Sequence, residues 1–168
     1  MVDQAWVKDV LERYEQRLVG YARRRLGDLE AAQDVVQECL LRLCRADQAQ
    51  VAPRLEAWLY TVCRNLVIDH QRKERRMRVI AEADPVVSPD STAPLEVAEQ
   101  RASLRAGIQK LSERDQEVLR LKFEDGLSYK DIAEVMELSV SNVGVILHTA
   151  IKRLRSELHP HYTEGSQA

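Results

Sequence analysis

The sequence predicts an all-α fold made of two small helical domains joined by a flexible acidic linker. Three observations lead to this prediction. Apolar residues recur at helical spacing, and no segment shows the period-2 alternation of a half-buried strand. Gly and Pro are few, at 6 and 5 of 168 residues, and aromatic residues make up only 5%. A proline-rich, acidic stretch divides the chain into two parts.

That stretch is residues 81–94, AEADPVVSPDSTAP, which combines prolines and acids with small polar residues. This composition is typical of a linker. We therefore expect one domain at residues 1–78 and another at 99–160, with the linker at 79–98 and a tail at 161–168.

Three helices are expected in the first domain. Apolar spacing places them at about residues 3–26, 29–45 and 54–78, with a polar loop at 46–54. Each helix has one apolar stripe, so the three are expected to pack around a shared core. The stripe of the third helix is Leu55, Trp58, Leu59, Val62 and Leu66.

Capping residues mark several helix ends. Gly27 is a natural C-terminal stop, and Asp28 is suited to cap the next helix. In the second domain, Ser112 and Ser128 each stand three residues before an acid, which resembles a capping box. Helical pattern resumes near Leu95.

Residues 128–155 have the spacing of a helix-turn-helix: SYKDIAEVM, a short turn, then a helix that begins near Ser141. Its inward stripe is expected to be Val143, Leu147, Ala150, Ile151, Leu154 and Leu158. Its outward set is Ser141, Asn142, Val145, His148, Thr149 and Lys152. Ser and Asn bond base edges and Val145 suits a thymine methyl, whereas phosphate contacts would come from lysine and arginine. A helical hairpin used only for packing is the alternative.

The charge balance is slightly acidic, with 25 Lys and Arg against 27 Asp and Glu. Residues 79–100 hold five acids and no Lys or Arg, whereas residues 1–78 have a net charge of +3. A chain of this balance lacks the general electrostatic attraction that drives stand-alone binding to phosphate backbones. If it reads DNA, it needs a second source of affinity.

The helix at 29–45 combines acids with an exposed leucine. Its inward residues are Val36, Cys39, Leu40 and Leu43. Another face is shared by Asp34, Glu38, Leu41 and Arg45, with Gln37 beside it. Acids at this spacing repel by a few tenths of a kcal/mol. The face is either an ordinary solvated surface or a docking patch for a basic partner with an apolar pocket.

Residues 64–78, RNLVIDHQRKERRMR, form a concentrated basic segment. Arg64, Asn65, Asp69 and Arg72 mix phosphate-binding with base-reading groups, which favours nucleic acid as the ligand. A solvated helix end is the alternative.

The cysteines and histidines predict neither a disulfide framework nor a metal site. The chain has an odd number of cysteines, Cys39, Cys44 and Cys63, and no other metal-ligating residues cluster with them. No cofactor is expected. The N-terminus lacks the pattern of a secretion signal, and no apolar stretch is long enough to span a membrane. The chain is therefore expected to stay in the cytosol.

Three segments together resemble bacterial RNA polymerase sigma factors of the sigma-70 family, in the small two-domain extracytoplasmic-function group. The segments are DLEAAQDVVQECLLRLC, LEAWLYTVCRNLVIDHQRKERR and LSERDQEVLRLKFEDGLSYKDIAEVMELSVSNVGVILHTAIKRLR. With the first helix they cover nearly all of residues 5–158 in the family's order. The resemblance implies a specificity subunit without its own catalytic site, which binds core RNA polymerase and promoter DNA.

The resemblance also implies a role for each surface. The positions that would dock on the clamp helices of the polymerase's largest subunit are Asp34, Gln37, Glu38 and Leu41. The positions that would bind the minus-ten element are Arg64, Asn65, Asp69, Arg72, Lys73 and Arg76. The positions that would read the minus-thirty-five element are Lys130, Ser139, Ser141, Asn142, Val145, His148, Lys152 and Arg153. The loop at 46–54 corresponds to the pocket for a flipped minus-ten base, and the linker would thread toward the RNA path.

The chain departs from the family's pattern in its last helix. The family commonly carries Lys or Arg near the positions of Gly144, Val145 and Ile146, which are apolar or bare here. Family members often pair with an anti-sigma factor, which adds such a partner to those expected. From the residues alone, a stand-alone helix-turn-helix regulator stays open as the alternative. An enzyme with its active site between the domains is a third hypothesis, but the sequence offers no set of catalytic residues for it.

Overall fold

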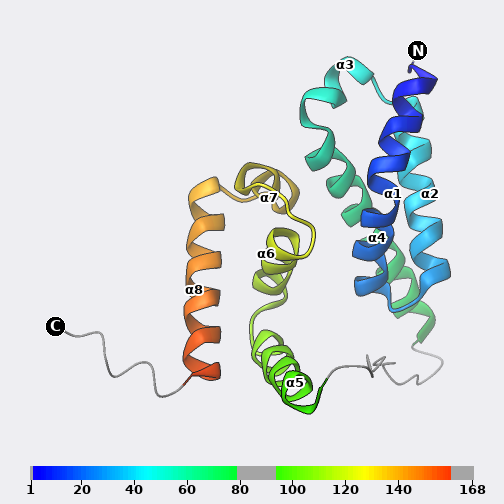
Figure 1. Cartoon of the computed structure of the whole chain (residues 1–168). Coiled ribbons are helices and arrows are strands. Elements are labelled where there is room, and N and C mark those ends of the chain that lie inside the picture. The colour runs from blue at the N-terminus through cyan, green and yellow to red at the C-terminus, as the bar shows by residue number, and fades with distance from the viewer. Residues whose placement is uncertain (1, 79–93, 160–168) are drawn as a thin grey trace. The chain divides into compact units, whose positions relative to one another are not determined.

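The computed structural model describes residues 2–78 and 94–159, and its regular elements there are all helices (Figure 1). No strand occurs among these residues, so the predicted all-α fold is confirmed. The chain divides into two compact units, Met1–Val87 and Ser88–Ala168. In the described part of the chain, no helix has the length and apolar character needed to cross a membrane.

The first unit is built on three long helices, α1 (Gln4–Leu26), α2 (Leu29–Arg45) and α4 (Leu55–Arg78). Each of the three contacts the other two, which gives one shared core. The fully buried side chains of this core include Val10, Leu18, Val36, Leu43, Leu59, Tyr60 and Val67. The three helices therefore pack around one shared core, as the sequence predicted.

The junction between α1 and α2 follows the predicted caps. Gly27 adopts the left-handed conformation, with φ of 71°, and its N–H donates to the Arg23 carbonyl. The Asp28 carboxylate accepts hydrogen bonds from the N–H groups of Glu30 and Ala31. Glycine reaches this φ without the penalty that a Cβ imposes, and the aspartate satisfies donors that the first turn leaves unpaired.

Residues 46–54 are not the loop that the sequence predicted. They contain a short helix, α3 (Gln48–Val51), and a 3-10 turn, η1 (Ala52–Arg54), which lead directly into α4. The Asp47 carboxylate caps α3 by accepting from the N–H of Ala49 at 3.0 Å. These elements are too short to show a helical apolar period, so only the cap and Pro53 signalled them.

The buried face of α4 also differs from the prediction. Its buried residues are Ala57, Leu59, Tyr60, Cys63 and Val67. Leu55, Trp58, Val62 and Leu66 are only half-buried. The helix contacts α1 and α2 at once, so its buried face is centred on Leu59, Tyr60 and Cys63, and Trp58 and Val62 lie at the margins of the contact.

Arg17 joins α1 to α4 at the edge of this core. Its guanidinium forms an ion pair with Glu56 and lies over the rings of Tyr14, at 5.1 Å, and Tyr60, at 5.9 Å. The Tyr60 ring also meets that of Tyr21 edge-to-face, with 5.5 Å between centroids. One side chain therefore combines charge pairing with two cation–π contacts.

The second unit consists of α5 (Leu95–Gln109), α6 (Glu113–Phe123), α7 (Tyr129–Met136) and α8 (Val140–Leu158). Helix α8 is central, because it contacts all of the other three. The buried core includes Leu111, Val118, Leu121, Leu127, Ile132, Val143 and Leu147.

The helix starts in this unit agree with the sequence. The Ser112 and Ser128 hydroxyls accept from the N–H groups of Asp115 and Asp131, each at 3.1 Å, which confirms both serines as N-caps. Helix α5 begins at Leu95, where the helical pattern was expected to resume, so residues 95–98 of the predicted linker are helical. The rest of that linker, apart from Pro94, and the tail lie outside the described residues.

Helices α7 and α8 form the predicted helix-turn-helix. Glu137, in the turn, adopts the left-handed conformation with φ of 55°. Helix α8 begins at Val140, one residue earlier than expected, with Ser139 as its N-cap. The buried residues are Val143, Ile146, Leu147, Ala150 and Leu154. Ile151 and Leu158 are half-buried, so Ile146 replaces them in the inward stripe, where α8 packs on α6 and α7.

Candidate nucleic-acid interface

The polar face of α2 is exposed as the sequence predicted. Asp34, Gln37 and Leu41 are exposed, and Leu41 retains 46% of its accessible surface. Glu38 is half-buried and accepts a hydrogen bond from Arg42 Nε at 3.1 Å, one turn further along α2. Such an exposed pair stabilises a helix only slightly, so a partner can compete for the carboxylate at small cost.

A groove of about 810 Å³ runs between α1 and α2 beside this face. Gln37 and Leu41 line it from α2, and its α1 wall mixes the apolar Val7, Leu11 and Val19 with Glu15, Gln16 and Arg23. The apolar residues of the groove include Val7, Leu11, Val19, Leu29, Leu40 and Leu41. The α1 side was missed by sequence reasoning, because half-buried residues such as Leu11 read as part of the core stripe.

The predicted minus-ten residues lie along one side of α4. Asn65, Asp69, Arg72 and Arg76 follow the spacing i, i+4, i+7, i+11, which places them in one line along a helix. These four and Lys73 are exposed, whereas Arg64 is half-buried. A single straight helix therefore presents base-reading and phosphate-binding groups in one row of about 16 Å, at about 1.5 Å of rise per residue.

The end of α1 adds charge to the same region. Gln71 Nε2 donates to the backbone oxygen of Arg25 at 3.0 Å, which fixes the last turn of α1 against α4. That turn carries Arg23, Arg24 and Arg25. Sequence reasoning did not assign these arginines a role, although three successive arginines before Gly27 were a visible signal.

The outward face of α8 is a line of four exposed residues. Ser141, Val145, His148 and Lys152 follow the same i, i+4, i+7, i+11 spacing, and Val145 is 62% exposed at its centre. Asn142 is exposed near the start of this line, and Lys130 is exposed at the start of α7. The predicted reading residues are thus on the surface, opposite the buried stripe.

Ser139 has a structural role as well. Its Oγ accepts a hydrogen bond from the Asn142 N–H at 3.0 Å and so caps α8. The hydroxyl proton is still available to donate to a phosphate or a base.

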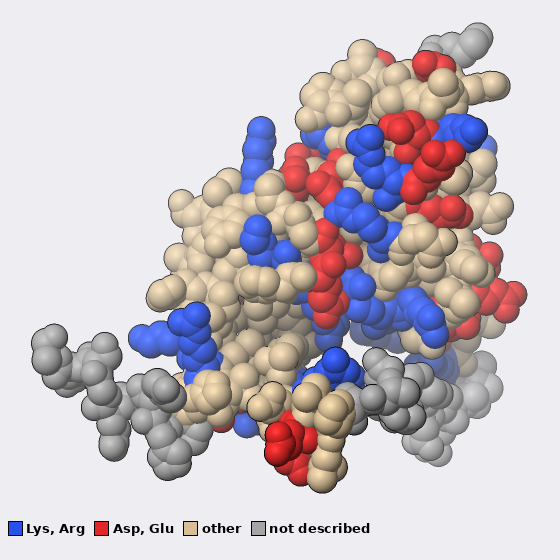
Figure 2. Space-filling view, in the orientation of Figure 1, with Lys and Arg blue, Asp and Glu red and all other residues tan. Residues whose placement is uncertain are grey.

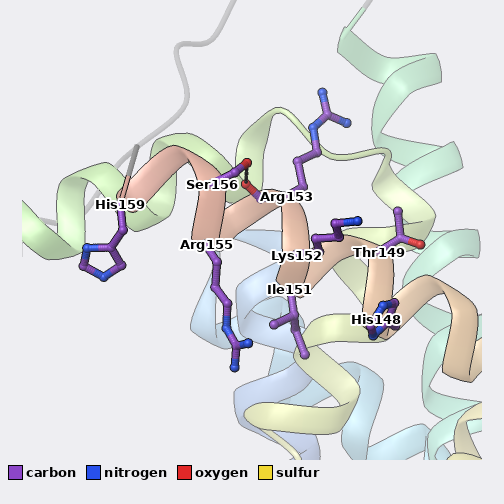
Figure 3. Close-up of a pocket in the computed structure, with 8 residues that line it drawn as sticks. All are labelled: His148, Thr149, Ile151, Lys152, Arg153, Arg155, Ser156 and His159. Atoms are coloured by element: carbon purple, nitrogen blue, oxygen red, sulfur yellow. Dashed lines mark hydrogen bonds between the residues drawn. The ribbon is translucent and has the colours of Figure 1, made fainter. Parts of the chain in front are cut away.

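Lys and Arg on α8 are confined to its C-terminal half, at Lys152, Arg153 and Arg155, which Figure 3 shows in close-up. Lys152, Arg153 and Arg155 line a hollow of about 940 Å³ along this half of the helix. In that view Arg153 and Arg155 project from opposite sides of α8. The helix can therefore meet phosphates near its end, whereas its leading half offers only uncharged groups.

On the face shown in Figure 2, the charged side chains do not form one large patch of a single sign. Figure 2 shows Lys and Arg interspersed with Asp and Glu on the face in view. A surface of this kind produces little long-range attraction for a polyanion. Affinity for DNA must then come from local contacts or from another protein.

A three-helix unit with a basic helix, followed by a helix-turn-helix unit, defines a DNA-binding protein of the helix-turn-helix class. Comparison with known proteins makes the class specific. Residues 10–77 match the model of sigma-70 region 2, and residues 101–154 match that of sigma-70 region 4.

Relatives agree along nearly the whole chain. The ECF RNA polymerase sigma factor SigL of Mycobacterium tuberculosis is 31% identical over 160 residues, which cover 93% of this chain and 90% of SigL. EcfG of Rhodopseudomonas palustris is 34% identical over 148 residues, covering 84% of this chain and 77% of EcfG. The chain belongs to the extracytoplasmic-function (ECF) group of the sigma-70 family and is a sigma factor.

A solved structure has the same fold. It is the sigma factor RpoE in complex with the anti-sigma factor NepR from Bartonella quintana, with a TM-score of 0.62 and 21% sequence identity. The match covers 92% of this chain and 97% of that chain. The family assignment does not favour the stand-alone regulator, because the N-terminal unit is also a sigma-70 region.

Proposed function

We propose that the chain binds core RNA polymerase through the α2 face and directs initiation by contacting two promoter elements. The minus-ten element would bind along α4, and the minus-thirty-five element would bind the outward face of α8. The chain would act in the cytoplasm with the polymerase and would have no catalytic site of its own.

One observation carries this proposal: the reading helix α8 has no Lys or Arg before Lys152. Uncharged groups discriminate between bases but contribute little affinity, since phosphate contacts dominate binding strength. A protein with such a helix needs a partner that supplies affinity, and core polymerase is that partner in a sigma factor.

The α2 face is suited to a basic partner that also offers apolar side chains. Asp34 and Glu38 supply negative charge, and Leu41 borders the groove between α1 and α2. An apolar residue inserted into the groove and a cation paired with the acids would together fix the orientation of docking.

An anti-sigma factor is a further partner that we propose. The support is the fold shared with a sigma factor solved in complex with an anti-sigma factor. A protein that covered the α2 face would prevent polymerase binding by direct competition.

The test combines purified chain, core polymerase and a library of promoters. Specific initiation should require both proteins. The double variant Asp34→Arg/Glu38→Arg should lose polymerase binding while its circular dichroism stays unchanged, because both side chains are at least partly exposed.

A charge-matched control is Glu96→Arg/Glu99→Arg, which changes two exposed acids on α5 by the same total charge. It should retain polymerase binding. If the α2 variant initiates as well as the unmodified chain, the docking assignment is wrong. If the unmodified chain together with core polymerase initiates on no promoter of the library, the proposed function fails.

A further inference from the structure

We propose that α8 reads an upstream element rich in A·T pairs, through contact of Val145 with a thymine 5-methyl group, and does not depend on a guanine. The inference rests on the proposed function, because it assigns a sequence class to the element that α8 reads. Val145 is the specificity-determining residue, and Asn142 is suited to pair with adenine.

The position of Val145 supports a direct base contact. It lies at the centre of the outward line, one turn after Ser141 and about one turn before His148, and it is 62% exposed. At 62% exposure Val145 buries little apolar surface within its own unit, whereas the major groove offers thymine methyl groups as an apolar contact. Desolvating one methyl group is worth about fourfold in affinity, which corresponds to about 0.8 kcal/mol.

Guanine recognition requires groups that this part of α8 lacks. Guanine is read mainly by Arg or Lys, which bond its O6 and N7 atoms together. In a helix-turn-helix, the N-terminal residues of the second helix contact base edges. Here the first Lys or Arg is Lys152, three turns or about 16 Å after Ser141.

The Tyr129 ring of α7 lies beside the position of Val145 on α8. A Cβ at Gly144 would lie only 3.7 Å from Tyr129 Cε2, so the Tyr129 ring lies close against α8 next to Val145. The Lys122 ammonium lies 5.2 Å from the centre of the same ring. Tyr129 of α7 thus lies near α8 beside Val145 and also contacts Lys122 of α6, so the start of α7 is held next to the reading position.

The experiment uses the complex of the chain with core polymerase and promoters with a randomised upstream element. Selection should return an A·T-rich element. Each thymine of that element is then replaced by uracil, which removes only the 5-methyl group. At one position the unmodified chain should lose about fourfold in affinity, and Val145→Ala should show no such loss.

Val140→Ala is the matched control. Val140 is also an exposed valine of α8, at 51%, but five residues before Val145 it points about 140° away around the helix. This variant should keep the uracil effect. Selection of an element with an essential guanine, or an equal uracil effect in Val145→Ala, overturns the inference. Either result leaves polymerase-dependent initiation intact, so it is distinguishable from failure of the proposed function.

Discussion

Replacement of Gly144 by alanine is expected to stabilise the second unit by about 1 kcal/mol, the cost of glycine relative to alanine inside a helix. Gly144 is the fifth residue of α8. The added Cβ would lie 3.7 Å from Tyr129 Cε2, an ordinary van der Waals distance, so no neighbour has to move. In a domain of 60–100 residues, this gain corresponds to a rise in Tm of about 4–8 °C.

Gly107 provides the opposite case within the same unit. It is a buried residue of α5, and its Cβ would lie 2.9 Å from Leu154 Cδ2 and 3.1 Å from Glu157 Oε2. Helix propensity would again favour alanine by at most about 1 kcal/mol. Leu154 is itself buried and has little room to move away, so the added Cβ overpacks the site at a cost of about 1–3 kcal/mol. We expect Gly107→Ala to destabilise the unit by about 1 kcal/mol.

The assay is thermal unfolding followed by far-ultraviolet circular dichroism and by tryptophan fluorescence. The two tryptophans, Trp6 and Trp58, both lie in the first unit, so fluorescence reports on that unit alone. The variants should shift the circular-dichroism transition in opposite directions and leave the fluorescence transition unchanged. A lower Tm for Gly144→Ala, or shifts of the same sign, would refute the reasoning from Cβ contacts.

Three further predictions concern the first unit. Burial raises the pKa of the Cys39 thiol to about 12, so exposed Cys44 should react with iodoacetamide in the folded chain and Cys39 only after unfolding. Since a free thiol ionises near pH 8.5, the contribution of Cys39 to stability should be complete below about pH 8 and decline as pH rises toward 12. Urea titrations followed by tryptophan fluorescence should show a smaller decline in Cys39→Ala. Arg17→Ala should lower the free energy of unfolding of this unit by about 2 kcal/mol, from two cation–π contacts and one ion pair, and an unchanged fluorescence midpoint would contradict this.

Helix boundaries were predictable because capping is local. Asp28, Ser112 and Ser128 each bond an N–H group two or three residues away, so the cap and its partner are adjacent in the sequence. The left-handed φ of Gly27 is likewise a property of one residue. Glu137 could not be predicted in this way, because a glutamate gives no sign in the sequence that it adopts the left-handed conformation.

Burial was less predictable because it depends on the partners of each helix. Ile146 is buried and Ile151 only half-buried, although both are isoleucines on neighbouring turns of α8. The contacts of α8 with α6 and α7 decide between them. The groove between α1 and α2 and the contact of Arg17 with the Tyr60 ring have the same origin, since each joins residues far apart in the sequence.

The exposed residues of α8 also constrain how the two proposed DNA contacts work together. The proposed phosphate contacts are Lys130 of α7 and Lys152 and Arg153 of α8. With these three contacts, the logarithm of the DNA-binding constant should fall with the logarithm of the salt concentration at a slope of about 3, which is shallow for a DNA-binding protein. Attachment to polymerase through α2 changes this, because a linked second site experiences an effective concentration in the millimolar range. A helix that binds weakly alone then reads promoters only as part of the complex. Replacing Val145 by Lys or Arg would raise the affinity of the free chain for DNA and so reduce its dependence on polymerase.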